Sequence, residues 1–268
     1  MNKLKIIDLF CGSGGFTLGF LKEKFEVQLA IDHDPYCEQV YKKNLPTTNF
    51  VLQNLSQINK KIFLGLKPDV VVGGPPCQGF STIGSRISSI EKKREKKDIR
   101  NNLVFSFIEH VNYLNPKIFL MENVSGILTR DKGEIFHELT KKIKNFGYKY
   151  EVFKLDAVNY GVPQFRKRVF IIGTKDEKYK ISKPNITHGE NFLLEEEIKI
   201  NSVIKDLAKI KIDESINHVP LKHKPTNLKR YRLIPEGGRL PEEKLPKELF
   251  RKNFGNTFKR LHRNKPSL

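Results

Sequence analysis

The sequence has 268 residues, which is enough for one large domain or for one domain plus a partial second. Lysine and arginine number 49 against 30 acidic residues, a formal charge of +19. This excess favours a polyanion partner, nucleic acid ahead of a membrane surface, over a merely lysine-rich composition. The three cysteines form no C-x-x-C pair, which argues against disulfides and a zinc site, and no apolar stretch has signal-peptide or membrane-spanning length. We therefore expect a soluble, cytoplasmic protein.

A glycine-rich turn follows the first predicted strand. Residues 6–10 form a short apolar run typical of a buried strand, and residues 11–20 lead through Gly12 and Gly14 into a predicted helix. Glycines let a ligand approach the backbone closely, and a helix N-terminus offers unpaired N–H groups to an anionic ligand. Taken alone, the segment fits a tight turn without a ligand equally well.

The second predicted strand, residues 27–31, is followed by acidic side chains. Asp32 is placed where a carboxylate accepts hydrogen bonds from ribose hydroxyls. Asp34 precedes a proline at the start of a predicted helix over residues 36–45, so we expect it to be the N-cap. We assign Asp32 to a nucleoside cofactor. Because Thr17 stands where the last glycine of G-x-G-x-x-G would be, a nicotinamide cofactor is disfavoured.

A rigid turn follows the fourth predicted strand, which begins at Val70. Two glycines and two prolines end this apolar run, and the turn then presents Cys77. A structural cysteine usually lies within an apolar face, whereas Cys77 lies where a parallel strand runs out into a loop. We therefore interpret Cys77 as a nucleophile.

The order of the predicted elements indicates the fold. A third strand, residues 50–52, leads to Asn54, a fifth, residues 118–121, ends at Glu122, and two more strands cover residues 148–155 and 169–172. Amphipathic helices flank the fifth strand, and this alternation predicts an α/β fold with a doubly wound, mostly parallel sheet. The carboxyl ends of its strands share one edge. We therefore expect the following groups, each just past a different strand, to converge on one crevice: the glycine turn, Asp32, Asn54, Cys77 and Glu122.

Positive charge is concentrated in two segments. Residues 80–100 carry seven lysines and arginines against three acidic residues, which fits either a lid that closes over a phosphate backbone or an exposed loop without a role. Residues 222–265 carry 14 against four glutamates and have little regular pattern, which suits binding to a polyanion. We expect a catalytic and cofactor-binding domain over residues 1–175 and a partial DNA-binding, target-recognition region over residues 176–268.

Four motifs in this order resemble the DNA (cytosine-5) methyltransferases. They are DLFCGSGG at residues 8–15, GPPCQGFS at residues 74–81, ENV at residues 122–124 and QFRKR at residues 164–168. The resemblance implies methyl transfer from S-adenosylmethionine to C5 of a flipped cytosine in double-stranded DNA, typically in a restriction-modification system.

The resemblance also assigns catalytic roles. The C5 carbon of cytosine is a weak nucleophile, so the Cys77 thiolate must first add at C6, and Glu122 is the candidate acid at N3. Arg168 would contact the cytosine O2, Arg166 would support the site, and Asn123 would hold the Cys77 turn. A structural ion pair is the alternative interpretation of Glu122.

Cofactor contacts follow from the same resemblance. Asp32 would bind the ribose and His33 would lie near the adenine. Asn54 stands where the family has an aspartate that accepts from the adenine amino group, a bond that an amide carbonyl can still accept. The remaining residues assigned to the pocket are Asp8, Phe10, Gly12, Gly14, Leu55, Pro76 and Leu103.

The end of the sequence departs from the family pattern, because an Arg-rich helix and a Gly-Asn motif are not found after the last basic segment. We therefore expect the chain to be incomplete alone, either as one part of a split enzyme whose second polypeptide carries these motifs or as the product of a truncated gene. A tRNA cytosine-5 methyltransferase and a catalytically idle nucleic-acid-binding remnant remain as alternatives. The DNA recognition sequence cannot be read from irregular loops.

Overall fold

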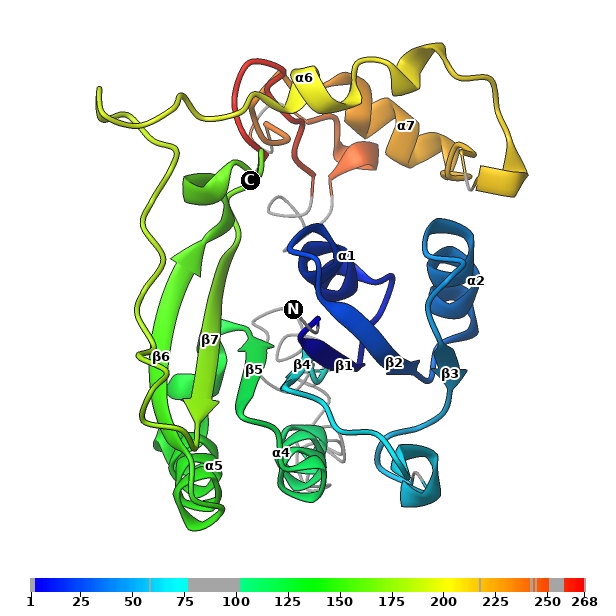
Figure 1. The fold of residues 1–268 in the computed structure, drawn as a ribbon. Helices are drawn as coiled ribbons and strands as arrows, with labels where there is room; N and C mark the ends of the chain where they lie inside the picture. The colour runs from blue at the N-terminus through cyan, green and yellow to red at the C-terminus, as the bar shows by residue number, and fades with distance from the viewer. Residues whose placement is uncertain are drawn as a thin grey trace. The chain divides into compact units, whose positions relative to one another are not determined.

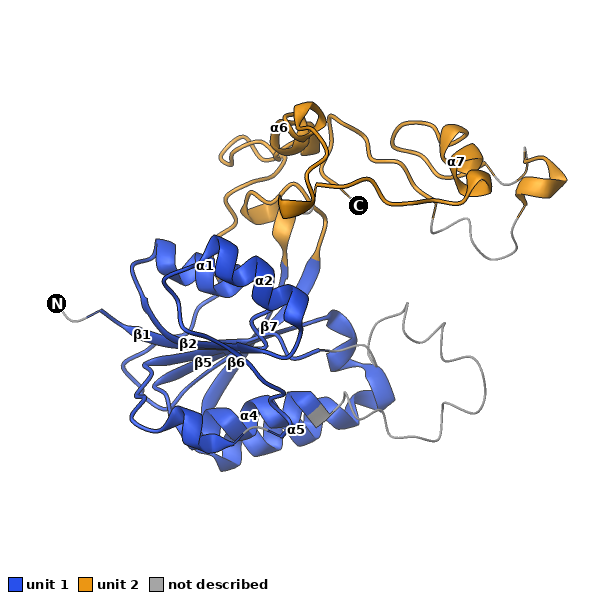
Figure 2. Cartoon of the chain, turned by 90° about the vertical axis from the view of Figure 1, so that its right-hand side faces the viewer, with its two compact units in different colours: residues 1–155, 167–183 blue, residues 156–166, 184–268 orange. Residues whose placement is uncertain are grey.

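The computed structural model describes residues 3–57, 59–76, 102–216, 218–241, 243, 245–250 and 258–267. Cys77 and the basic segment 80–100 lie outside these residues. The chain divides into two compact units, which Figure 2 colours separately. Unit 1 contains residues 1–155 and 167–183, and unit 2 contains residues 156–166 and 184–268. The sequence-based division was placed after residue 175, whereas unit 1 extends to residue 183 and unit 2 also contains residues 156–166. The function of each unit stays a prediction.

Unit 1 is built on a seven-stranded sheet of order β3-β2-β1-β4-β5-β7-β6 (Figure 1). The pairs β1–β2, β1–β4, β2–β3 and β4–β5 are parallel, and β7 runs antiparallel to β5. This topology confirms the predicted α/β fold with a mostly parallel sheet. In chain order the strands are β1 Lys5–Leu9, β2 Glu26–Asp32, β3 Phe50–Leu52, β4 Val70–Gly73, β5 Ile118–Asn123, β6 Lys149–Asp156 and β7 Lys167–Thr174.

Helices cover both faces of this sheet. Figure 2 shows α1 and α2 on one face and α4 and α5 on the other. Their bounds are Gly15–Lys22 for α1, Pro35–Asn44 for α2, Asn102–Leu114 for α4 and Glu134–Asn145 for α5. Asp34 accepts a hydrogen bond from the Tyr36 backbone N–H at 2.8 Å and so caps α2, as the sequence predicted. None of the helices within the described ranges combines the length and apolar content needed to cross a membrane.

The central strands are buried on both faces. Ile7 of β1 and Val71 of β4 have no exposed surface and belong to one core cluster with Phe107 of α4, and the alternate residues Ile6 and Val72 are equally buried in a second cluster. Helices on both sides of a parallel sheet remove such side chains from water, which explains the near-continuous apolar runs of β1 and β4. Each fully buried aliphatic side chain contributes about 1.5–3 kcal/mol, so these clusters fix the sheet and its edges.

Strand register aligns the carboxyl edge of the sheet. Leu9 pairs with both Ile31 and Gly73, and Gly73 pairs with Met121. The next residue on each strand therefore falls in one row across the sheet. This row contains Phe10, Asp32, Gly74 and Glu122. Because β2 and β5 extend further than predicted, Asp32 and Glu122 lie in the last two residues of their strands and not just past them.

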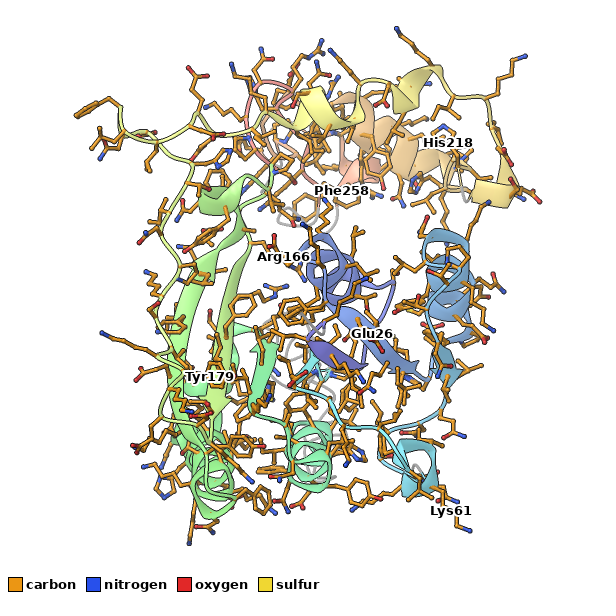
Figure 3. The ribbon with its side chains drawn as sticks, viewed as in Figure 1. Glu26, Lys61, Arg166, Tyr179, His218 and Phe258 are labelled. Carbon is orange, nitrogen blue, oxygen red and sulfur yellow. The ribbon has the colours of Figure 1, made fainter. Side chains whose placement is uncertain are left out.

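Unit 2 has little regular structure. It contains the helices α6, Ile200–Ile204, and α7, Pro225–Arg232, and a small apolar cluster that includes Phe258, labelled in Figure 3. Arg230 of α7 is buried, donates from Nε to the Leu249 carbonyl at 2.7 Å, and lies 5.7 Å from the centroid of the Phe258 ring. A buried guanidinium is tolerated here because a carbonyl and an aromatic face both contact it.

Replacement of Gly73 by alanine is expected to disrupt the centre of the sheet. An added Cβ would lie 2.3 Å from the Leu9 carbonyl oxygen and 2.8 Å from Phe107 Cε2. We expect Gly73→Ala to lower the free energy of unfolding by about 3 kcal/mol in urea denaturation. Gly19→Ala is the control, because the added Cβ meets nothing within 4 Å. At this exposed position of α1, alanine stabilises the helix by about 1 kcal/mol relative to glycine. Equal stability of the two variants would contradict this account.

Candidate active site

Asp8 in β1 is buried and fixes the start of α1. Its Oδ2 accepts hydrogen bonds from the Thr17 N–H at 3.1 Å and the Thr17 hydroxyl at 2.7 Å, and Tyr41 donates to that hydroxyl at 2.9 Å. Burial raises the pKa of Asp8 to about 7; the Thr17 bonds oppose this shift and the charge of Asp32 adds to it. Asp8 has no exposed surface, so in this structure it positions the glycine turn indirectly, by holding Thr17 at the start of α1.

Asp32 organises the backbone of the glycine turn. Its Oδ2 accepts from the Gly12 N–H at 2.9 Å, and its Oδ1 accepts from the N–H groups of His33 at 2.7 Å and Asp34 at 3.0 Å. A carboxylate has about four acceptor positions, so these three bonds leave capacity for a ribose hydroxyl. The remaining acceptor capacity of Asp32 therefore fits the predicted nucleoside contact.

The two predicted glycines of the turn have different requirements. Both have left-handed backbone angles, with φ of 53° at Gly12 and 91° at Gly14. A Cβ on Gly14 would also lie 2.7 Å from Leu45 Cδ1 and 2.9 Å from Tyr41 Cε2, whereas a Cβ on Gly12 would meet nothing within 4 Å. Gly14 is thus needed for packing against α2, and Gly12 provides the N–H group that meets Asp32.

A cavity of about 210 Å³ opens beside the ends of β1, β2 and β3. This volume lies below the roughly 300 Å³ at which small-molecule pockets begin, so the cavity suits one part of a ligand such as a nucleoside. The structure brings together five of the residues assigned to the cofactor, and sequence reasoning missed Gln53 and Ser56. The full lining is Phe10, His33, Gln53, Asn54, Leu55, Ser56 and Leu103.

Asn54 has both acceptor positions of its carbonyl occupied. Oδ1 accepts from the Ser56 N–H at 3.0 Å and from the Ser56 hydroxyl at 2.8 Å. An amide oxygen has two lone pairs, so Ser56 must release one bond before Asn54 accepts from an adenine amino group. The Asn-x-Ser spacing is a signal for this local turn that could have been recognised in the sequence.

Glu122, Asn123 and the Gly-Pro-Pro turn lie together at the end of β5. Arg168 of β7 places Nε 2.9 Å from Glu122 Oε1, and both side chains are about three-quarters buried, with 22% and 25% exposed. Asn123 donates from Nδ2 to the Pro75 carbonyl at 3.4 Å. The contact of Asn123 ties β5 to the turn that continues through Pro76 to Cys77, and Cys77 itself is not among the described residues.

Arg166 belongs to unit 2, directly before β7 (Figure 3). Its N–H donates to Asp156 Oδ1 at 2.7 Å, its carbonyl accepts from the Ala157 N–H at 3.1 Å, and its side chain is exposed. These bonds close the segment between β6 and β7. Its support of the catalytic site stays a prediction.

Solved structures with the same fold are methyltransferases. A DNMT2 variant from Spodoptera frugiperda superposes with a TM-score of 0.60 at 21% identity, covering 87% of this chain and 66% of that one. The Entamoeba histolytica methyltransferase EhMeth gives a TM-score of 0.60 at 18% identity, covering 88% and 68%. At these identities the likeness establishes the fold alone.

The chain belongs to the C-5 cytosine-specific DNA methylase family, whose model matches residues 4–261. It is 33% identical to the Type II methyltransferase M1.HphI of Haemophilus parahaemolyticus over 99% of this chain and 70% of the relative. It is also 36% identical to the Type II methyltransferase M.DdeI of Desulfomicrobium norvegicum over 79% of this chain and 50% of the relative. The predicted membership of the DNA (cytosine-5) methyltransferases is confirmed, and family and fold together imply S-adenosylmethionine as cofactor.

The buried carboxyl of Asp8 is expected to make stability depend on pH. Its pKa is about 7 in the folded protein, above the usual 3.8, so the folded state binds the extra proton and stability falls as pH rises through 7. Relative to the non-titrating variant Asp8→Asn, the wild type should lose about 2–3 kcal/mol of unfolding free energy between pH 5 and 8. Urea denaturation at several pH values measures this, and parallel profiles would contradict it.

Proposed function

We propose that this chain transfers a methyl group from S-adenosylmethionine to C5 of a flipped cytosine in duplex DNA, within a restriction-modification system. The observation that carries the proposal is the Glu122–Arg168 ion pair beside the turn that leads to Cys77. Family membership and the Type II methyltransferase relatives support it. A structural role alone does not explain why this acid lies at the end of β5 while the neighbouring strand β4 leads into a glycine-proline turn and a cysteine.

The proposed chemistry assigns one task to each group. The Cys77 thiolate forms a bond to C6, and the displaced electron pair makes C5 nucleophilic while Glu122 stabilises the charge at N3. C5 would then take the methyl group as the S–CH3 bond breaks and the cofactor leaves as a thioether. Transfer of the C5 proton to a solvent water would return the electron pair that breaks the bond from C6 to sulfur and expels the Cys77 thiolate. Arg168 fixes the rotation of the Glu122 carboxyl group and would contact the cytosine O2. Asn123 keeps the turn in place through Pro75.

S-adenosylmethionine supplies the electrophilic methyl group when it is bound. Asp32 would hold the ribose, because its carboxylate retains acceptor capacity beside the glycine turn. Phe10, Leu55 and Leu103 would form apolar walls around the adenine, with His33 at the mouth of the cavity. The net charge of +19 would attract the phosphate backbone of DNA. The binding free energy gained in this way would offset the free energy needed to remove a base from the stack.

A methyl-transfer assay with tritiated cofactor tests the proposal. We expect the chain, together with the predicted second polypeptide, to label duplex DNA and not tRNA, and Cys77→Ala to abolish labelling. Labelling of tRNA alone would support the tRNA alternative. Absence of both labelling and cofactor binding would support the idle remnant. The second polypeptide and the cytoplasmic location stay predictions, and labelling by the chain alone would contradict the first of them.

Loss of the acid at Glu122 should affect chemistry and not cofactor binding. We expect Glu122→Gln to lower the rate of methyl transfer at least 10²-fold, the usual contribution of a positioned acid, with the dissociation constant of S-adenosylmethionine unchanged within about twofold. Glu151→Gln is the matched control, because this residue is exposed on β6. A Glu122→Gln variant with the wild-type rate would leave Glu122 as a structural ion-pair partner.

A further inference from the structure

We infer that Ser106 and His110 of α4 form a bracket that positions the adenine wall of the cofactor cavity by holding the Leu55 carbonyl. Ser106 Oγ donates to the Leu55 carbonyl at 3.0 Å, and His110 Nε2 lies 2.8 Å from the same oxygen. Both lone pairs of one backbone oxygen are thus satisfied by one helix. The inference rests on the proposed use of this cavity for S-adenosylmethionine and adds two positioning residues to it.

The bracket connects two walls of the cavity. Leu55 follows β3 and lines the cavity, and Leu103, on the first turn of α4, lines it too. Leu103, Ser106 and His110 are spaced by three and four residues, so they share one face of the helix. The two walls are therefore kept in register by hydrogen bonds as well as by packing.

The segment after β3 has few other anchors. β3 is three residues long and forms the end of the sheet order. The backbone bonds of this segment are Gln53 N–H to the Asp32 carbonyl at 2.8 Å and Gln57 N–H to the Asn54 carbonyl at 3.1 Å. The second of these is local, so among the described residues the bracket supplies the hydrogen bonds that hold the middle of the segment against α4, in addition to the packing of the buried Leu55 side chain.

The surroundings of His110 favour the neutral ring as donor. His110 is 5% exposed, and its ring centroid lies 5.7 Å from that of Phe63. Only an Nε2–H tautomer can donate to the Leu55 carbonyl. Nδ1 is buried and has no hydrogen-bond partner within the described ranges, so a second proton there would be unsatisfied.

The charges that face His110 come from two elements. Lys60 lies on the turn Lys60–Phe63 and Glu109 on α4; Lys61 of the same turn points away into solvent (Figure 3). Burial lowers the pKa of His110 below 6.5, Lys60 adds to this shift, and the Leu55 bond and Glu109 oppose it. Because the pKa of His110 is lowered in the folded protein, the bracket weakens as pH falls below the ordinary histidine value of 6.5 toward that lower pKa.

Variants at position 110 separate the hydrogen bond from packing. We expect His110→Leu to weaken S-adenosylmethionine binding about fivefold in calorimetry at pH 7.5, the equivalent of one net hydrogen bond, and His110→Gln to restore most of the affinity through its amide donor. Ser106→Ala should give a smaller loss. His137→Leu, at an exposed histidine of α5, is the control and should bind like wild type.

Two further readouts distinguish positioning from a general loss of stability. In the free 268-residue chain, hydrogen exchange at residues 53–57 should accelerate in His110→Leu while α4 stays protected. The ratio of His110→Gln to wild-type affinity should rise as pH falls from 7.5 to 5.5, because the variant lacks the titrating ring. Asp8 titrates in both proteins, so the ratio removes its contribution.

The failures of the two proposals are distinguishable. If wild type binds no S-adenosylmethionine, the proposed function fails, and exchange at residues 53–57 alone decides whether the bracket holds this segment. If wild type binds but folded His110→Leu binds equally well, the bracket is wrong. Failure of His110→Gln to recover affinity, or a flat affinity ratio between pH 7.5 and 5.5, would also overturn it.

Discussion

The pairing of β1 with β2 and β4 is the constraint on which the candidate site depends. Leu9 is level with both Ile31 and Gly73, and this register continues to β5. This pairing requires glycine at position 73, because any side chain there would collide with the Leu9 carbonyl. The proposed cofactor side of the edge, at Asp32, and the proposed catalytic side, at Glu122, are therefore set by the same central strand. A shift of one residue would move one side relative to the other.

Much of the fold and part of the site follow from sequence pattern. Short apolar runs that end in glycine, aspartate or glutamate indicate parallel strands, and the positions of Asp32, Asn54 and Glu122 along one edge follow from that topology. Asp34 was recognisable as an N-cap from the proline after it. These inferences succeed because each depends on local spacing or on a rule for the whole sheet. The antiparallel direction of β7 agrees with the short β6–β7 connection, which has no room for a crossover helix.

Contacts between distant elements were not predictable. Nothing local shows that Tyr41 of α2 reaches Thr17, or that this hydroxyl satisfies a carboxyl on β1. His110 interrupts an apolar helix face in the sequence, and its partner is a backbone carbonyl 55 residues earlier, a group that has no sequence signature. The assignment of Asp8 to the cofactor followed from the motif alone. In the structure Asp8 is buried and acts on the same turn indirectly, through its hydrogen bonds to Thr17.

The two aspartates that contact the glycine turn and the start of α1, Asp8 and Asp32, have different environments and different roles. Asp8 is desolvated and accepts hydrogen bonds only from Thr17 among the described residues, so burial outweighs those bonds and favours the protonated form. Asp32 accepts from three backbone N–H groups, an arrangement that suits a carboxylate. Two negative charges this close repel each other, so a proton on Asp8 removes the repulsion. Asp8 can then hold α1, while Asp32 keeps the acceptor capacity that the proposed ribose contact needs.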